Sequence, residues 1–465
     1  MDLILEKIIH ITNGIFLGDL PISTKINFIS IDTRKILQNN SKSKDKVLFI
    51  PIKGKNFDGH DFLESAFKNG AAIALVDKKH EKKINNISNN VIIVDNTKNA
   101  LQNIAAFYRR KFDIKAIGVT GSVGKSTVKE MLASIFGIEL KIVKTIKNLN
   151  GQIGLPLAMF GINKETQILI AEMGISEINE MERLSEIVDP DFAIITNIGV
   201  SHLENFKTTE ITCREKLKIS KRENCKFYLN GDNPKLSRVN LPNEIKYFGL
   251  SGNYPYRAEQ IYSTGEKTNF VLATNKFREN IEIPCLGVHN VYNALAAISV
   301  AIDAGIYLED IKAGLERFKP LPQRGQILHV GDIIFLDDSY NASPDSVKSS
   351  INIFQAIKSD GKSIMVMADM LEIGVRSEEI HFNIGKYIAL SGINILITVG
   401  NLAKFIGDGA RSVDSNVEIL YFINNDLALK ELIFRIRSGD KILIKGSRGM
   451  KTEEILNNLV SYYHK

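Results

Sequence analysis

The sequence predicts an α/β protein with three domains and mainly parallel sheets. Helix-length segments separate eight short apolar runs that end abruptly in polar or glycine-containing turns: VIIVDN, IKAIGVTG, ILIAEMG, FAIITNIG, IIFLDDS, SIMVMADM, ILITVG and ILIKGS. Because these runs are continuous rather than alternating, they indicate strands covered on both faces, as in parallel sheets. A length of 465 residues suggests roughly three domains of about 150 residues each.

Changes in local amino-acid composition along the chain predict the domain boundaries. Residues 1–85 contain the linker-like NNSKSKDK and end near GAAIALVDKK, which indicates a small N-terminal α/β domain. Residues 86–318 form the expected central domain, in which the stretch from about 226 to 285 suggests short peripheral strands and loops. Pro320 and Pro322 stop a helix and disfavour a strand, so we expect a third α/β domain over residues 319–465.

The composition narrows the class of protein. Lys plus Arg exceed Asp plus Glu by 59 − 53 = 6, and this diffuse excess argues weakly for anionic ligands and not for nucleic acid. Cys213, Cys225 and Cys285 form no C-x-x-C pair, which is typical of a reducing compartment without disulfides or structural zinc. Asp2 and Glu6 in MDLILEKIIH favour an amphipathic helix over a signal peptide. We therefore expect a cytoplasmic protein that does not insert into a membrane.

The stretch GVTGSVGKST, residues 118–127, predicts a phosphate-binding loop. A strand-like run precedes it, and the following STVKEMLASIF has its apolar residues at helical spacing, which is the context such a loop requires. Gly121 and Gly124 permit close approach of the backbone, while Lys125 can reach phosphates and the Ser126 hydroxyl can bind Mg²⁺. An ordinary strand-to-helix turn is the alternative. The predicted nucleotide-binding residues are Thr120, Gly121, Ser122, Val123, Gly124, Lys125 and Ser126, which make this a P-loop ATPase domain.

Two side chains downstream of the loop are candidate metal ligands. Glu172 ends the run ILIAE, and His202 follows AIITN by a few residues. Ligands gather at the carboxyl ends of parallel strands, and oxygens with an occasional imidazole suit a metal beside phosphates. We predict that both residues bind metal near the loop.

The motifs, taken in order, resemble the Mur ligases of peptidoglycan synthesis over essentially the whole chain. They are TGSVGKST, NLNGQIGLPL, AEMG, TNIGVSHLENF, GVHNVYNALAA, DDSYNASPDSV, MADMLEIG…H and KGSRGM. The family's loop has the form T-G-S-x-G-K-[ST], so Val119 at the place of the usual first glycine is no defect. DDSYNASPDS and MLEIG…H are most similar to the member that joins D-alanyl-D-alanine to UDP-N-acetylmuramoyl-tripeptide through an acyl phosphate.

The resemblance implies the cofactors and the catalytic residues. It implies ATP and two Mg²⁺ ions, one held by Ser126 and Glu172 and the other by His202. The family's carbamylated lysine falls at Lys216, so Lys125, His202 and Lys216 are the expected catalytic residues. The usual A-K-x-E reads EKLK here, with Glu215 before the lysine, which leaves the surroundings of Lys216 open. A solvated helix lysine is the alternative interpretation.

The resemblance also implies substrate contacts in each domain. The nucleotide contacts are Asn290, Asn293, Arg324, Asp338, Tyr340 and Asn341. For Asn290 and Asn293, helix capping is an alternative that does not exclude nucleotide binding. Thr33 and Arg34 would contact the UDP group in the N-terminal domain, whereas GKNFDGHDF is equally well explained as a structural turn. Lys445, Ser447 and Arg448 of a Rossmann-like C-terminal domain would receive the carboxylate of D-alanyl-D-alanine.

Three other interpretations compete with this one. The ligase that adds the third peptide residue is marked by D-N-P-R in its C-terminal domain, but DNPK lies at residues 232–235 here and suggests a turn. Folylpolyglutamate synthase lacks the N-terminal domain. A regulator without catalysis is expected to lose Lys125, Glu172 or Asp338, which this chain keeps. We expect a monomer.

Overall fold

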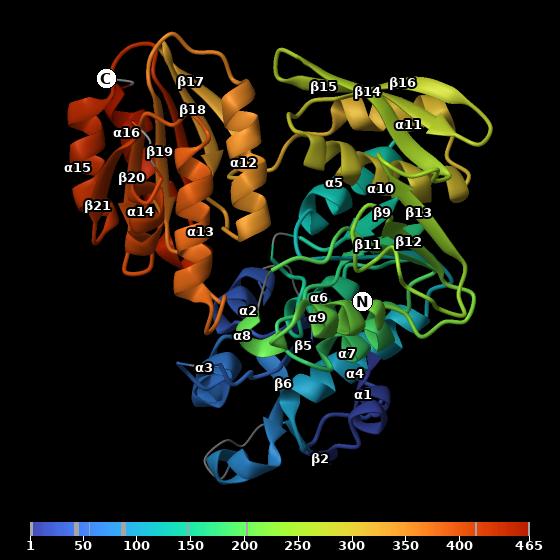
Figure 1. Ribbon diagram of the computed structural model, residues 1–465. Helices are drawn as coiled ribbons and strands as arrows, with labels where there is room; N and C mark the ends of the chain where they lie inside the picture. The colour runs from blue at the N-terminus through green and yellow to red at the C-terminus, as the bar shows by residue number, and fades with distance from the viewer. Residues whose placement is uncertain are drawn as a thin grey trace.

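The computed structural model describes residues 3–40, 46–54, 56–84, 90–146, 148–200, 203–413 and 416–463. These residues form one two-stranded sheet and three larger α/β layers, which Figure 1 shows as a blue N-terminal region, a cyan-to-yellow central region and an orange-to-red C-terminal region. The predicted α/β class with three sheet-containing regions is confirmed. Among the described residues no helix is both long and apolar enough to cross a membrane.

The N-terminal region is built on a five-stranded sheet. Its elements are β1 (Leu3–Ile4), α1 (Leu5–Thr12), β2 (Ile15–Leu17), β3 (Lys25–Ile26), β4 (Phe28–Ser30), α2 (Thr33–Asn40), β5 (Val47–Phe49), η1 (Gly59–Phe62), α3 (Leu63–Lys68), β6 (Ala71–Asp77), η2 (Lys78–Ile84), β7 (Val91–Val94) and α4 (Thr97–Arg110). The strand order is β2-β7-β6-β5-β4, with β2 antiparallel to β7 and the other pairs parallel. The amphipathic helix expected near the N-terminus is α1.

The strand β7 lies in the N-terminal sheet although the sequence boundary at residue 85 assigned it to the central domain. Its continuous apolar run pairs in parallel with β6, which fixes it there. We therefore propose to place the boundary after β7. Helix α4 follows, and one hydrophobic core continues from Ile92 through Leu101 and Ile104 to Leu169 of the next sheet. The N-terminal and central regions consequently share a packed interior.

The central region has a nine-stranded sheet in the order β16-β15-β14-β13-β12-β11-β8-β10-β9. Its elements are β8 (Lys115–Thr120), α5 (Lys125–Phe136), β9 (Ile142–Lys144), α6 (Gly154–Met159), β10 (Ile168–Glu172), α7 (Glu180–Val188), β11 (Phe192–Ile195), α8 (Leu203–Phe206), α9 (Thr209–Leu217), β12 (Lys226–Asn230), β13 (Ile245–Gly249), β14 (Tyr256–Thr264), β15 (Lys267–Thr274), β16 (Arg278–Ile283), α10 (Val288–Asp303) and α11 (Leu308–Arg317). Strands β9 to β14 and β8 pair in parallel, whereas β14, β15 and β16 form an antiparallel meander. Strands β14 and β15 are longer than the short strands expected there.

The C-terminal region has a six-stranded sheet in the order β17-β18-β22-β19-β20-β21. Its elements are β17 (Gln326–Val330), β18 (Ile333–Asp338), α12 (Pro344–Ala356), β19 (Ser363–Ala368), α13 (Ser377–Ala389), β20 (Ile395–Val399), α14 (Ala403–Arg411), β21 (Glu418–Phe422), α15 (Asn425–Arg435), β22 (Lys441–Lys445), η3 (Arg448–Met450) and α16 (Glu453–Tyr463). Only β17 is antiparallel to its neighbour. Pro320 and Pro322 lie in the irregular link between α11 and β17, as predicted.

The helix after the phosphate loop is anchored by its apolar face. Val128, Met131, Leu132, Ile135 and Phe136 are all buried, as their spacing predicted. Helix α11 crosses α5 so closely that a Cβ added at Gly314 would lie 2.4 Å from the Ile135 Cα. The Ser134 hydroxyl donates a hydrogen bond of 2.6 Å to the Gly314 carbonyl at the same crossing. This crossing fixes the C-terminal end of α5 against α11.

We expect Gly314→Ala to destabilise the protein by about 1–3 kcal/mol, because the added methyl group meets backbone that cannot move aside. Urea unfolding followed by circular dichroism measures this change. Gly407→Ala in α14 is the matched control: its Cβ would come no closer than 3.3 Å to a side-chain atom, and it is expected to be neutral or stabilising. Equal stabilities for the two variants would contradict the close crossing.

Candidate nucleotide-binding site

A cavity of about 1040 Å³ opens where the three regions meet. Its wall includes Ile31 from the N-terminal region, the phosphate loop and the start of α10 from the central region, and loops at the carboxyl ends of β18, β19 and β22. The structure brings most of the predicted site residues into this wall: Ser122, Val123, Gly124, Lys125, Ser126, Glu172, Asn290, Asn293, Arg324, Asp338, Tyr340, Asn341, Lys445, Ser447 and Arg448.

The remaining predicted residues, among them the buried Lys216, are not part of the described cavity wall. Thr120 and Gly121 belong to the loop but are buried and lie outside the cavity wall. Thr33 and Arg34 open α2 outside the cavity wall, and the Arg34 guanidinium donates to the adjacent Asp32 carboxylate at 2.9 and 2.8 Å. The Arg34 side chain is otherwise 87% exposed. His202 lies outside the described residues.

The phosphate loop depends on two glycines that no other residue replaces without strain. Gly121 has a φ of 146° and Gly124 a φ of 86°, a region that favours glycine. A Cβ at Gly121 would lie 1.9 Å from the Thr196 Oγ1, and one at Gly124 would lie 2.3 Å from the Asn293 Oδ1. Strand β11 and helix α10 therefore close around the loop from two sides.

The residues after β11 hold the first half of the loop. The Ser122 N–H donates to the Asn197 carbonyl at 2.9 Å, and the Val123 N–H donates to the Asn197 side-chain oxygen at 3.1 Å. The Thr196 hydroxyl also donates to the Val123 carbonyl. These bonds leave the N-terminus of α5, with its positive dipole end and first-turn N–H groups, to face the cavity.

The Lys125 ammonium lies at the centre of the loop. Its Nζ donates to the carbonyls of Gly121 at 2.8 Å and Ser122 at 3.2 Å. Burial lowers the pKa of Lys125, the Glu172 carboxylate opposes this shift, and the Arg324 guanidinium adds to it. The cation is thus placed where a phosphate anion would relieve its desolvation.

Glu172 has one carboxylate oxygen that is free to bind a metal ion. One carboxylate oxygen accepts a hydrogen bond of 2.8 Å from the Asn150 amide, while the other is buried without any hydrogen bond. The Lys129 ammonium stays 3.8 Å from that second oxygen because it donates to the Thr145 carbonyl at 2.9 Å. Ser126 is buried at the helix start in the same cavity wall. A carboxylate and a hydroxyl arranged in this way suit Mg²⁺.

Lys216 is a buried lysine near the end of α9. Its exposed fraction is 2%, so the alternative of a solvated helix lysine is wrong. Burial holds the pKa of Lys216 well below its ordinary value, and the charge on Lys125 lowers it further. Glu215 and Lys218, the two residues that depart from the A-K-x-E pattern, bond to each other and to the protein. The Glu215 carboxylate accepts from the Asn179 N–H at 2.8 Å and pairs with Lys218 at 3.0 Å. The departure from A-K-x-E therefore does not expose Lys216.

The C-terminal region contributes a buried ion pair to the cavity. The Lys445 ammonium donates to the Asp338 carboxylate and, at 3.0 Å, to the Asn341 carbonyl. The Ser350 hydroxyl also donates to Asp338. This pair joins the ends of the neighbouring parallel strands β18 and β22. Beside it, the Arg324 guanidinium stacks 3.8 Å over the Tyr340 ring, which makes a flat cationic surface.

At the start of α10, the side chains of Asn290 and Asn293 supply amide groups but do not cap the helix. The N-cap residue is Gly287, and no side chain caps this helix, so the capping interpretation of Asn290 and Asn293 is wrong. The Asn290 amide donates to the Leu286 carbonyl at 2.8 Å, and the Asn293 amide donates to the Asn290 oxygen at 3.0 Å. Burial lowers the pKa of neighbouring His289 to about 4, so the cavity presents a neutral imidazole there at pH 7.

The loop after β22 faces the same cavity. The Ser447 hydroxyl accepts a hydrogen bond of 2.8 Å from the Leu371 N–H, which ties it to the loop after β19. The Arg448 side chain is half exposed and donates to Glu453 at 2.7 Å. Its guanidinium carbon lies 5.9 Å from the Tyr340 ring centre, on the rim of the cavity. The histidine of the motif MLEIG…H, His381, is structural: its Nε2 accepts from the Met370 N–H at 2.9 Å.

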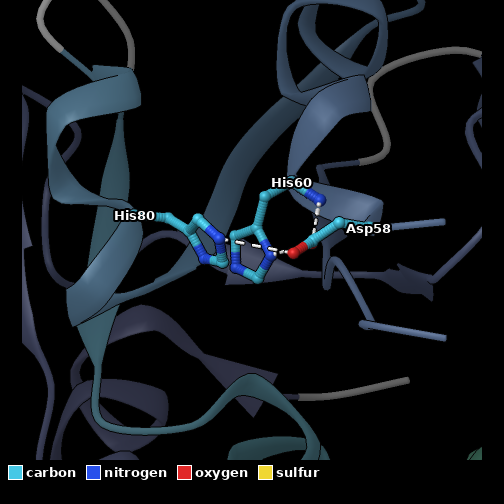
Figure 2. A group of neighbouring side chains, drawn as sticks. All are labelled: Asp58, His60 and His80. Atoms are coloured by element: carbon cyan, nitrogen blue, oxygen red, sulfur yellow. Dashed lines mark hydrogen bonds and ion pairs between the residues drawn. The ribbon is translucent and has the colours of Figure 1, made fainter. Parts of the chain in front are cut away.

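The stretch GKNFDGHDF forms a structural cluster with His80 (Figure 2). The Asp58 carboxylate caps η1 at the His60 N–H and lies 2.6 Å from the His60 Nδ1. Because the His60 Nε2 accepts the Asp77 N–H at 3.1 Å, the ring proton is on Nδ1 and is donated to Asp58. Both His60 nitrogens are therefore occupied, and His80 stacks on the ring at 4.1 Å. The structure therefore favours the turn interpretation, since both ring nitrogens of His60 are used in hydrogen bonds within this turn and to Asp77.

Sequence reasoning assigned no role to several residues that shape the cavity. Asn150 donates a hydrogen bond to Glu172 and orients it. It lies in NLNGQIGLPL, a motif of the family resemblance to which the sequence assigns no chemical role. Asp232 of DNPK lines the cavity and accepts from the Tyr292 hydroxyl at 2.9 Å. Asn197 belongs to TNIG, directly after a predicted strand, so its position at a strand end was the available signal.

Fold and site together define a phosphate-loop nucleotide-binding protein. Three family models match: "Mur ligase family, catalytic domain" over residues 25–109, "Mur ligase middle domain" over 119–301 and "Mur ligase, glutamate ligase domain" over 323–448. A relative from Bacillus subtilis (strain 168), named UDP-N-acetylmuramoyl-tripeptide--D-alanyl-D-alanine ligase, is 35% identical over 441 residues, which cover 94% of each chain. The chain belongs to the Mur ligase family.

Solved structures agree with this assignment. MurF from Acinetobacter baumannii superposes with a TM-score of 0.89 at 28% identity, covering 99% of both chains. MurF ligase from Thermotoga maritima in complex with ADP superposes with a TM-score of 0.81 at 26% identity, covering 94% of this chain and 98% of that one. The fold similarity therefore extends over all three regions.

We expect Gly124→Ala to weaken ADP binding at least about tenfold, because the methyl group would strain the loop and push Asn293 away. Isothermal titration calorimetry with ADP and Mg²⁺ measures the change. Gly161→Ala is the control. Gly161 lies outside the cavity wall, and a Cβ there would come no closer than 3.3 Å to another atom, the Ala158 carbonyl oxygen, so this variant is expected to bind ADP as the unmodified chain does. Unchanged affinity of Gly124→Ala would contradict the placement of nucleotide at the loop.

Proposed function

We propose that this chain is an ATP-dependent ligase that joins D-alanyl-D-alanine to UDP-N-acetylmuramoyl-tripeptide. The observation that carries the proposal is the composition of the cavity wall. The wall contains the phosphate loop, the Glu172 carboxylate with one oxygen free of hydrogen bonds, and the cationic loops of the C-terminal region. A nucleotide, a carboxylate and an amine must meet in one place for such a reaction. The relatives' printed names supply the substrates.

The proposed reaction begins at the phosphate loop. The terminal carboxylate of the tripeptide attacks the γ-phosphorus of ATP, ADP leaves, and an acyl phosphate forms. The dipeptide amine then attacks the acyl carbon, and phosphate leaves from a tetrahedral intermediate. Lys125 and the N-terminus of α5 offset the negative charge where carboxylate and triphosphate approach, the largest electrostatic demand of the first step.

Residues for metal binding surround the same position. Ser126 and the free oxygen of Glu172 fit one Mg²⁺, and we assign a second ion to His202 and Lys216, the first of which lies outside the described residues. Bound Mg²⁺ would neutralise phosphate charge during transfer. The buried Lys216, with its depressed pKa, favours the neutral amine that adds carbon dioxide to become a carbamate ligand.

The nucleotide's base and ribose fit the wall between α10 and β18. Asn290 and Asn293 present amides, Asp338 can accept ribose hydroxyl groups, and the Arg324–Tyr340 stack lines the phosphate side. Asn341 stands beside them. Because Lys445 donates to the Asp338 carboxylate, we propose that it holds Asp338 in place rather than receiving the dipeptide.

The peptide substrates occupy the remaining ends of the cavity in this proposal. Ser447 and Arg448 receive the dipeptide carboxylate, since they lie on the rim after β22. Ile31 reaches the cavity from the N-terminal region, so Thr33 and Arg34 are placed to contact a UDP group only if Arg34 exchanges Asp32 for a phosphate. We propose a cytoplasmic monomer, in line with the three free, buried cysteines.

Phosphate release in the presence of ATP, UDP-N-acetylmuramoyl-tripeptide and candidate amines tests the proposal. We expect turnover with D-alanyl-D-alanine and none with single amino acids. Glu172→Gln is expected to lower turnover by at least about a hundredfold, because a neutral amide binds Mg²⁺ poorly. Lys78→Gln, on the exposed η2 of the N-terminal region, is the control. Turnover with single amino acids alone would overturn the dipeptide assignment.

Arg448→Ala tests the dipeptide site. We expect the KM for D-alanyl-D-alanine to rise about tenfold or more, because a charge-assisted hydrogen bond to the carboxylate is lost. The KM for ATP should change little. Lys451→Ala, three residues on and exposed, is the matched control. An unchanged KM for the dipeptide would remove Arg448 from the site.

A further inference from the structure

The acidic residue Asp345 of the C-terminal region contacts the segment that borders the phosphate loop. It lies in the first turn of α12, where Ser343 and Ser346 form a capping box and Pro344 occupies the first helical position. These caps fix the helix start, and therefore the backbone from which the Asp345 side chain projects. Asp345 lines the cavity next to Val200 of the central region.

The contact between Asp345 and the central region is close. The carboxylate accepts a hydrogen bond from the Val200 N–H. It also packs against Gly199 so tightly that a Cβ there would lie 2.1 Å from the Asp345 Oδ2. Gly199 has no left-handed φ, so its backbone does not require glycine, and the space taken by Asp345 is what excludes a side chain.

The residue that Asp345 contacts is bonded to the phosphate loop. The Gly199 N–H donates to the Ser122 Oγ at 3.0 Å, and the same hydroxyl donates to the Gly199 carbonyl at 3.2 Å. Two residues earlier, Asn197 accepts the N–H groups of Ser122 and Val123. A continuous path of contacts therefore runs from α12, through residues 197–200, to the first half of the loop.

We propose that Asp345 is a positioning residue that couples docking of the C-terminal region to the shape of the phosphate loop. The inference rests on the proposed use of this loop for ATP. With Asp345 in place, residues 197–200 are held against Ser122, and the loop is preorganised for phosphate. Because such coupling is reciprocal, nucleotide on the loop favours the docked arrangement of the C-terminal region.

The geometry predicts how three variants compare. Asp345→Ala removes the acceptor for the Val200 N–H and should weaken ADP binding about fivefold to tenfold, the range for one lost hydrogen bond. Asp345→Asn keeps a side-chain oxygen at that position and should stay within about twofold of the unmodified chain. Gly199→Ala displaces the carboxylate and should reproduce the loss seen in Asp345→Ala.

The decisive measurement is a double-mutant cycle on ADP affinity, with Mg²⁺ present, by isothermal titration calorimetry. Once Asp345 is truncated, the methyl group at residue 199 has room, so Gly199→Ala should add almost no further loss. Asn352→Ala, exposed on the same helix, is the control and should bind ADP normally. Thermal unfolding midpoints of all variants should agree, which separates positioning from loss of folding.

Three outcomes would overturn the inference: unchanged ADP affinity in Asp345→Ala, no rescue by Asp345→Asn, or additive losses in the double variant. The cycle uses no peptide substrate. If the proposed ligase reaction failed with D-alanyl-D-alanine, the unmodified chain would show no turnover, while the ADP-binding cycle would still report on Asp345. The two failures are therefore distinguishable.

Discussion

The structure depends on keeping one short loop open at the end of β8. Gly121 and Gly124 have positive φ values, and Thr196 and Asn293 occupy the space where their side chains would be. Strand β11 and helix α10 come from distant parts of the chain, yet β11 ends at this loop and α10 begins beside it. The nine-stranded sheet serves to hold these elements in register, so the loop is shaped before any anion reaches it.

Charge around the cavity is balanced pair by pair. Lys445 is buried against Asp338. Lys129 pairs with Glu130 at 3.0 Å, donates to the Thr145 carbonyl and stays 3.8 Å from Glu172. Removing either partner would leave a charge in a poorly solvated place, which costs more than the pair contributes. Among the described residues of the cavity wall, Lys125 donates to two neutral carbonyls rather than to a carboxylate. The imbalance at Lys125 explains why the cavity suits an anion at that point.

The contacts between regions differ in kind. The N-terminal and central regions share a hydrophobic core through α4. The C-terminal region has two cores, built on Leu336 and on Phe335, and the first of them includes Leu286 of the central region. Its contact with the central loop is polar, through Asp345 and Val200. A shared hydrophobic core fixes two regions relative to each other, whereas a polar contact at the edge of a cavity can open at little cost in free energy. Movement of the C-terminal region is thus compatible with substrate entry.

Local pattern determined the strands, the loop and its helix, because continuous apolar runs and the G-K-S-T step carry their own physical signal. The sequence also assembled the correct family. Sequence alone left open what depends on packing: which sheet β7 joins, whether Lys216 is buried or solvated, and whether Asn290 caps α10 or bonds to the Leu286 carbonyl. Burial and hydrogen-bond partners arise from distant residues, so only the tertiary structure decided that Lys445 holds Asp338, that Glu172 keeps one oxygen free and that Asp345 reaches Gly199.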